Sequence, residues 1–445
     1  MTRRQLLRYV AAAPATALFA PTAAASLTGC SQPSELSGPG QRLRDAEQAA
    51  SLVLSMAEKA RRQGTFGVGG ALVENATGRV FHAMHNTVVQ SLGMDLGPSS
   101  GTAFVRDPTA HAELKLVNWY FATQGVETLP DPSALTVVTS LDPCAMCAGA
   151  LMTAGFNVAV VAYDDFAGVN WNMKNDFPDY PAEIHDRLLA FGYYADEAGR
   201  AYFGPPDILF ADSSVTDKTA DGCETVFTDN LSQARDAVSA SGLNPRDRAN
   251  ATTDPATLPE NSIFRLRYQE AFGQAFSVRL ADYRRPDERL QNHLQALVKQ
   301  TPQARNAVAF IDYYGNLLMS SADRFDQSPV ATAFMTAVQQ YSALRFSLMN
   351  DPETVDSARK SLHSAKYGTF VFLFAPDGFT TTSLMDLGAY GSAMESAVPV
   401  KTPSGFQFYQ DPATGSLADL NSLIRAMPPF YGPALVDIAP QKVAS

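Results

Sequence analysis

The feature that most constrains this chain is a histidine and a glutamate two residues apart, followed by two closely spaced cysteines. His111 and Glu113 lie in His-Ala-Glu, and Cys144 and Cys147 lie in Pro-Cys-Ala-Met-Cys. One imidazole and two thiolates supply three ligands of a tetrahedral zinc ion and leave the fourth position open, as in catalytic zinc sites. The chain must therefore fold so that these two segments meet.

The local sequence predicts how the ligands are presented. Good helix formers over Ala112–Phe121 predict a helix that begins directly after His111. Pro143 suits the first position of a second helix, because that position needs no backbone N–H. Cys144 and Cys147 then lie one turn apart near the positive end of the helix, which favours their thiolate forms.

Glu113 distinguishes a catalytic zinc site from a redox cysteine pair or a structural zinc site. A Cys-x-x-Cys pair also serves redox chemistry or structural zinc, and a lone histidine is often a core residue. A structural zinc site does not need Glu113. A carboxylate beside zinc can instead carry protons between water and a substrate nitrogen, which is the chemistry of hydrolytic deamination.

The flanking residues resemble a known family. The stretches Asp107–Glu113 and Thr139–Leu151 are similar to the cytidine/deoxycytidylate deaminase superfamily, most closely its tRNA adenosine deaminase and guanine deaminase branch. The resemblance runs from about Asp45 to about Trp171. It implies an α/β fold with a mixed central sheet in a three-layer α-β-α arrangement, and one Zn²⁺ per chain.

The resemblance also implies the parts that bind substrate. Phe66–Val73 and Arg79–His85 resemble the first two strands of the family. Asn86 stands where the family uses an asparagine to hold the substrate base, and the backbone N–H of Ala112 is expected to help hold the substrate. Thr87–Arg106 is longer than the usual link at this point, and its glycines and proline predict a loop that borders the pocket.

The carboxyl-terminal half resembles the amino-terminal half without its metal ligands. We predict a degenerate second copy, although any α/β unit can show the same order of elements by chance. Thr332 and Phe334 replace His111 and Glu113. Three pairs of matching segments carry the prediction: Val308–Met319 with Gly70–Phe81, Ser328–Phe334 with Asp107–Glu113, and Ala375–Gly378 with Leu141–Cys144.

The amino terminus resembles an export signal. Arg3 and Arg4 precede an alanine-rich apolar stretch, as in twin-arginine signals. Leu27-Thr28-Gly29-Cys30 resembles a bacterial lipobox, so we expect lipidation of Cys30, membrane attachment through that lipid, and a periplasmic or cell-surface location. The whole organisation is then a signal peptide (1–29), a tether (30–44), the zinc deaminase unit (45–210), a linker with a short helix at Leu231–Ala240 (211–261), and the degenerate unit (262–445).

Composition bears on the substrate. The formal net charge of −11 disfavours a phosphate backbone, which basic patches normally bind. We therefore expect a small nucleobase or nucleoside as substrate, with guanine or another purine favoured. An exported tRNA or nucleic-acid deaminase, a deaminase of an unusual heterocycle such as a pterin, and a non-catalytic zinc-binding surface scaffold are the alternatives. For assembly, we expect either the two units to pair within one chain or a homodimer to form.

Overall fold

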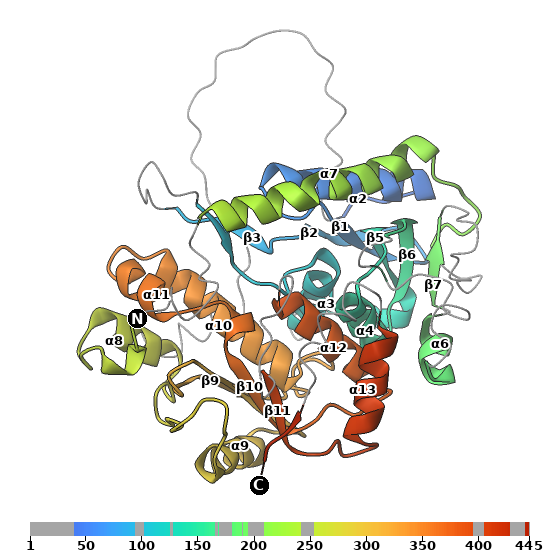
Figure 1. The fold of residues 1–445 in the computed structure, drawn as a ribbon. Coiled ribbons are helices and arrows are strands. Elements are labelled where there is room, and N and C mark those ends of the chain that lie inside the picture. The colour runs from blue at the N-terminus through green and yellow to red at the C-terminus, as the bar shows by residue number, and fades with distance from the viewer. Residues whose placement is uncertain are drawn as a thin grey trace, which may run out of the picture.

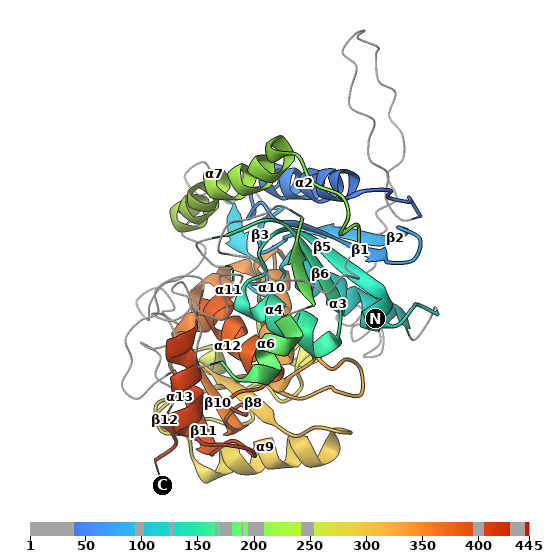
Figure 2. The ribbon, with the colours of Figure 1, turned by 90° about the vertical axis from the view of Figure 1, so that its right-hand side faces the viewer.

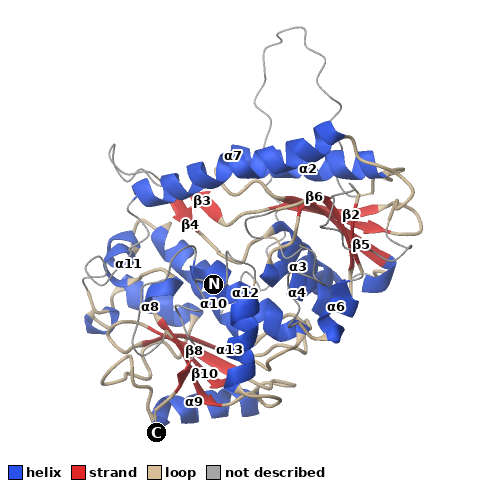
Figure 3. Cartoon of the chain, turned by 45° about the vertical axis from the view of Figure 1, so that its right-hand side comes forward, coloured by secondary structure: helices blue, strands red, loops and turns tan. Residues whose placement is uncertain are grey.

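The described part of the protein contains two five-stranded β-sheets, each with helices on both faces (Figure 1). The computed structural model describes residues 40–93, 102–124, 128–164, 168, 180–188, 190–194, 209–241, 253–394, 405–427 and 441–444. We call residues 40–241 the amino-terminal unit and residues 253–444 the carboxyl-terminal unit. Figure 3 shows the two sheets separated by a central layer of helices.

The sheet of the amino-terminal unit is mixed. Its strand order is β2-β1-β5-β6-β7, with β2 and β5 antiparallel to β1 and with β6 and β7 continuing in parallel from β5. β5 is buried along its whole length, as expected for the middle strand of a covered sheet. The bounds are β1 (Gly69–Glu74), β2 (Val80–His85), β5 (Leu135–Leu141), β6 (Asn157–Ala162) and β7 (Phe191–Tyr193).

Helices cover both faces of this sheet. α2 starts at an N-cap, Asp45, whose carboxylate accepts the backbone N–H of Gln48, and it packs on β1 and β5 together with α7. α3 and α4 lie on the opposite face, toward the centre of the molecule (Figure 1). The bounds are α2 (Ala46–Arg62), α3 (Ala112–Gln124), α4 (Ala145–Ala154), α6 (Ala182–Leu188) and α7 (Asp217–Ser241).

The prediction for residues 211–261 was wrong about the length of the helix. The sequence predicted a short helix at Leu231–Ala240, whereas α7 begins at Asp217 and packs along α2. Cys223, Phe227 and Ala234 form its buried stripe. Many Thr, Asp and Asn residues surround these apolar positions, which hid the helical period in the sequence.

The sheet of the carboxyl-terminal unit repeats the first arrangement. Its order is β9-β8-β10-β11-β12, with β9 and β10 antiparallel to β8 and with parallel pairs beyond β10. The bounds are β8 (Ala307–Ile311), β9 (Leu317–Ala322), β10 (Thr369–Phe374), β11 (Phe406–Gln410), β12 (Gln441–Lys442), α8 (Ile263–Ala271), α9 (Glu288–Gln300), α10 (Ala333–Met349), α11 (Val355–Ser361), α12 (Thr381–Met394) and α13 (Leu417–Ala426).

Matching details extend to the first hairpin of each sheet. Each hairpin has a register shift before its turn, and each turn contains a glycine with positive φ, Gly78 at 67° and Gly315 at 85°. The carbonyl of each glycine accepts a backbone N–H at 2.8 Å, from Leu43 and Leu280 respectively. These shared details support the predicted duplication.

The two units meet through α4 and α12, which lie between the sheets (Figure 2). Glycines permit the close approach. A Cβ atom on Gly149 would lie 2.4 Å from the backbone nitrogen of Met385, and one on Gly388 would lie 1.9 Å from the backbone nitrogen of Met146. The contacts are reciprocal, so an approximate two-fold relation pairs Gly149 with Gly388 and Met146 with Met385. One hydrophobic cluster joins both units across this contact.

The predicted loop Thr87–Arg106 is partly a hairpin. β3 (Val89–Ser91) pairs antiparallel with β4 (Ala103–Val105), and residues 94–101 lie outside the described residues. Phe104 of β4 is fully buried in the shared cluster. The turn-forming residues in the sequence concealed these two short strands.

Residues 1–39, including the predicted signal and Cys30, lie outside the described residues. Within the part of the chain that the structure describes, no helix combines the length and apolar character needed to cross a membrane.

Candidate zinc centre

The structure brings His111, Cys144 and Cys147 together. Their ligand atoms all lie within 4.8 Å of one another, and His111 Nδ1 is 3.5 Å from Cys144 Sγ. Tetrahedral zinc with bonds of about 2.0 Å to nitrogen and 2.3 Å to sulfur places such atoms about 3.5 Å apart, so the residues fit the ion. No other group of three His, Cys, Asp or Glu side chains in the described ranges forms such a cluster.

The cysteines lie at the start of α4, with one correction. Cys144 is the N-cap and the helix begins at Ala145, so Pro143 precedes the cap instead of occupying the first helical position. Cys147 still lies one turn into the helix. Burial raises the pKa of the Cys147 thiol well above its ordinary value, and the neighbouring Cys144 raises it further. Zinc bound at the sulfur would offset this cost, because it favours the thiolate.

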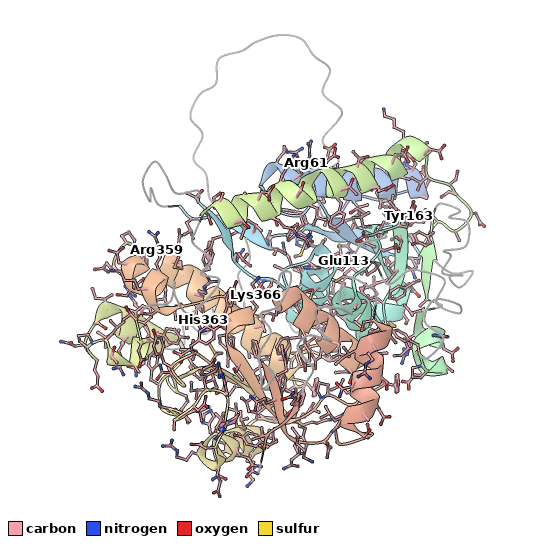
Figure 4. All side chains as sticks on the ribbon, viewed as in Figure 1. Arg61, Glu113, Tyr163, Arg359, His363 and Lys366 are labelled. Carbon is pink, nitrogen blue, oxygen red and sulfur yellow. The ribbon has the colours of Figure 1, made fainter. Side chains whose placement is uncertain are left out.

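Glu113 lies inside the amino-terminal unit, whereas Arg61 lies on the outer helix layer (Figure 4). Glu113 is only 3% exposed, and its Oε1 accepts a hydrogen bond of 2.8 Å from the hydroxyl of Thr139, which also lies 3.0 Å from the carbonyl oxygen of Leu141. Burial raises the pKa of the Glu113 carboxyl, and His111 opposes that rise. This carboxylate is thus held at the metal cluster by a residue of β5.

Thr139 is a residue that sequence reasoning missed. It lies in the stretch that resembles the family, but no role followed from its type alone. The fold gives it one, because β5 runs beneath α3 and turns this side chain toward Glu113. An alcohol at a fully buried strand position is the only sequence signal for it.

Asn86 and Ala112 contact one another. Asn86 is buried just after β2, and its Oδ1 accepts the backbone N–H of Ala112, the first residue of α3, at 2.7 Å. The asparagine therefore satisfies one unpaired N–H at the helix start. Among the described residues, its amide nitrogen has no hydrogen-bond partner, so that end is the one directed to a substrate in the predicted role.

The carboxyl-terminal unit has a matching position for each site residue. Asp323, after β9, accepts the N–H of Ala333 at 2.7 Å, as Asn86 does for Ala112. Thr332 therefore matches His111, and Phe334 matches Glu113. The strand registers match Phe372 to Thr139, and Phe334 and Phe372 stack with ring centroids 5.9 Å apart.

The cysteine positions are also matched, but not where the sequence placed them. Since Met146 pairs with Met385, Cys147 matches Asp386 and Cys144 matches Ser383. The proposed match to Ala375–Gly378 is wrong, because extra residues between β10 and α12 shift the register. The Thr332 hydroxyl donates to Asp386 at 2.6 Å, so a hydrogen bond occupies the place of the metal cluster.

Comparison with known proteins agrees with this geometry. Residues 43–163 match the family model of the cytidine and deoxycytidylate deaminase zinc-binding region. These residues form a zinc-binding deaminase domain of that superfamily. The cofactor prediction is thereby confirmed by both the family and the ligand cluster. The chain is 27% identical over 157 residues to a tRNA-specific adenosine deaminase of Haemophilus influenzae, covering 35% of this chain and 79% of that protein.

Solved structures of deaminases are also similar to part of this chain. A tRNA A34 deaminase has 27% identity, with 27% of this chain and 78% of that chain covered and a TM-score of 0.21. A guanine deaminase from Nitrosomonas europaea has 16% identity, with 46% and 100% covered and a TM-score of 0.26. The cytidine deaminase-like fold is evident from the mixed sheet between helix layers described above.

Proposed function

We propose that this protein is a zinc-dependent hydrolytic deaminase of a free nucleobase or nucleoside, with guanine or another purine favoured. The observation that carries the proposal is the buried Glu113 beside His111, Cys144 and Cys147. A zinc site that only stabilises the fold would not need an acid there, and the hydrogen bond from Thr139 fixes its orientation. This argues against the non-catalytic scaffold.

The residues divide the chemistry between them. His111, Cys144 and Cys147 would hold zinc, and the bound ion would supply a water of lowered pKa as the nucleophile. Deamination forms a C–O bond at the ring carbon and breaks its bond to the exocyclic amine. Glu113 would accept the first proton of the attacking water and pass it to the ring nitrogen. It would then take the second proton, from the hydroxyl at the ring carbon, and pass it to the amine, which leaves as ammonia. A raised pKa suits a group that must both accept and release a proton.

Asn86 is proposed to orient the base. Its Oδ1 is fixed by Ala112, so its amide nitrogen can donate to a carbonyl or ring nitrogen of the substrate. In this arrangement the Ala112 N–H does not contact the substrate itself. It holds Asn86 in place, and Asn86 contacts the substrate. The matching Asp323 makes the same backbone contact in the unit without ligands, so this contact also has a structural part.

A tRNA substrate is the second candidate, because the relative from Haemophilus influenzae carries that activity in its name. The net charge of −11 opposes it, since nucleic-acid binding needs basic surface. A free purine is compatible with the negative net charge of the chain and with a relative that is named as an adenosine deaminase. A pterin is a further small heterocycle with the same amine-bearing ring chemistry.

The test is ammonia release by the zinc-loaded protein against free bases, nucleosides, pterins and tRNA. Turnover of a purine, reduced by about 10²- to 10⁴-fold in Glu113→Gln with zinc retained, is expected. Glu58→Gln, at a half-buried position on α2, is the matched control and should behave as wild type. Turnover of tRNA alone would replace the small-molecule proposal, and turnover that survives in Glu113→Gln would refute the role of the acid.

We also propose export by the twin-arginine route and lipid attachment at Cys30, on the basis of the paired arginines and the lipobox. Export of a folded protein would let zinc bind the two thiolates in a reducing compartment first. In a bacterial host, Cys30→Ala should move the protein from the membrane to the soluble fraction. Substitution of Arg3 and Arg4 by lysine should retain it in the cytoplasm, and unchanged fractionation would contradict the assignment.

A further inference from the structure

A helix of the metal-free unit contacts the segment that presents a zinc ligand. Gln339 lies on α10, and its Nε2 donates to the hydroxyl oxygen of Thr109 at 3.2 Å. Thr109 is 1% exposed and lies two residues before His111. The contact therefore joins residues 230 apart in the sequence directly beside the metal cluster.

Thr109 is the centre of a tight turn. Its backbone N–H and its hydroxyl both donate to Asp107 Oδ1, each at 2.8 Å. Its carbonyl accepts the backbone N–H of His111 at 2.8 Å. The hydroxyl has a single proton, which goes to Asp107, so Gln339 must supply the proton of the second bond. The amide of Gln339 thus completes the hydrogen bonding of the turn that sets the position of His111.

Other contacts of α10 hold the neighbouring hairpin. Asn350, which caps the end of α10, accepts the backbone N–H of Gly93 at 2.8 Å. The guanidinium of Arg106 lies 5.7 Å from the ring centroid of Phe346, and Arg345 lies 4.5 Å from that of Phe104. Contacts with the carboxyl-terminal unit therefore hold both described stretches between Asn86 and His111, residues 87–93 and residues 102–110.

We propose that Gln339 is a positioning residue for the zinc site, acting through Thr109 on the orientation of His111. Groups behind the metal ligands fix ligand geometry, and their loss typically weakens metal binding by about 10- to 100-fold. Here such a group comes from the unit that has no such ligands among its described residues. The role concerns retention of zinc, so it goes beyond the proposed function and does not depend on which substrate is turned over.

The experiment measures zinc release from the full chain to an excess of a chromogenic chelator. Gln339→Leu keeps the size of the side chain and removes its donor, and it should speed zinc release by about 10-fold. The thermal unfolding midpoint, measured on the same sample, should stay close to that of wild type, because Gln339 is only half-buried. A release rate within about two-fold of wild type would overturn the proposal.

Two controls separate positioning from a general loosening between the units. Gln340→Leu makes the same change at the next, also half-buried, position of α10, and zinc release should not change. In a Thr109→Val background, Gln339→Leu should add nothing, because the bond it removes is already absent. Faster release in Gln340→Leu, or independent effects of the two changes, would contradict a role through Thr109.

A variant that retains more polarity guards against misfolding of Gln339→Leu. Gln339→Glu has nearly the same shape, but the ionised carboxylate cannot donate and lies near Asp107. Zinc release at least as fast as in Gln339→Leu is expected. Release at the wild-type rate from this folded variant would show that no donor is needed at this position and would refute the proposal.

Discussion

The two units of this chain share one strand order and differ at the positions of the three zinc ligands and the acid, which lie where the units meet. His111, Glu113, Cys144 and Cys147 in one correspond to Thr332, Phe334, Ser383 and Asp386 in the other. The sheet, the hairpin turn and the crossing of α4 with α12 remain in both. The fold therefore depends on burial and backbone pairing, whereas the metal chemistry depends on a few side chains that can change without loss of the fold.

In the carboxyl-terminal unit, aromatic side chains occupy the positions that match Glu113 and its partner Thr139. Phe334 packs against Phe372, Phe370, Tyr390 and Phe406, with ring centroids 4.5–5.9 Å apart. Where the deaminase domain keeps a buried acid and its hydroxyl partner, this unit has aromatic rings. At these positions the carboxyl-terminal unit buries apolar rings, which stabilise it without a ligand.

The largest expected effect comes from one pair of equivalent residues. Cys144→Ala removes a ligand, so zinc content should fall toward zero and turnover by at least about 10³-fold. Ser383→Ala, at the matching position, should leave one zinc per chain and normal turnover. Metal analysis and ammonia release on both variants test this. Loss of zinc in Ser383→Ala would show that the two units are not separated in function as described.

The next effect concerns the contact between the units. Gly388→Ala would place a Cβ atom 1.9 Å from the backbone nitrogen of Met146, so α4 and α12 must separate. We expect the free energy of unfolding to fall by about 1–3 kcal/mol, as for other overpacked cores, with weaker zinc binding because α4 carries both cysteines. Chemical denaturation measures the first and chelator competition the second.

Gly222→Ala on α7 is the matched control for that substitution. The nearest atom to its new Cβ is a flexible side-chain carbon, Leu54 Cδ2, at 3.1 Å. Replacement of glycine by alanine inside a helix should then raise the free energy of unfolding, by up to about 1 kcal/mol. Equal effects in the two variants would argue against close packing as the cause.

A smaller effect is expected at the partner of the acid. Thr139→Val removes the hydroxyl that binds Glu113 and keeps the shape of the side chain. Loss of one hydrogen bond to a charged group corresponds to about 1.5–3 kcal/mol, so turnover should fall by roughly 10- to 100-fold with zinc retained. Steady-state kinetics together with metal analysis test this prediction. Unchanged turnover would show that Thr139 does not contribute to catalysis.

A pH dependence of stability is also expected, and it originates in the carboxyl-terminal unit. Burial raises the pKa of Asp386 to about 8, above its value of about 4 in an unfolded chain. The unfolded state therefore loses this proton first as pH rises, and the stability from the protonated form declines between about pH 4 and pH 8. Asp386→Asn cannot ionise and keeps an acceptor for Thr332, so its unfolding midpoint should exceed that of wild type more at pH 8 than at pH 5.

The exposed Asp356→Asn is the control for this comparison. It removes one carboxylate from α11 without a buried partner, so its difference from wild type should be similar at pH 5 and pH 8. Thermal unfolding of the three proteins at both pH values suffices. An equal pH dependence in wild type and Asp386→Asn would show that Asp386 does not titrate in this range.

Some of the architecture could be predicted because it is local. The α3 helix starts at Ala112 as expected, and the strands near Arg79–His85 and Val308–Met319 follow apolar patterns around glycine turns. Features that depend on distant packing were missed. The full length of α7 follows from its contact with α2, and the pairing of β3 with β4 depends on burial of Phe104 against α10.

By itself, the sequence determined the kinds of chemistry available to this protein. His111, Cys144 and Cys147 are metal ligands by residue type, Glu113 is a proton carrier by its place beside them, and the absence of such residues at Thr332 and Phe334 was readable in the carboxyl-terminal half. These conclusions need only residue type and short spacing.

Only the tertiary structure decided which residues act together across the chain. The hydrogen bond from Thr139 to Glu113 and that from Gln339 to Thr109 each join segments that are far apart in the sequence. The equivalence of Asp386 and Cys147 likewise became clear only from the packing of α4 against α12. Such contacts depend on strand register and on the crossing of helices. A shift of one residue in a strand turns a side chain to the opposite face, and local sequence does not fix that choice between distant segments.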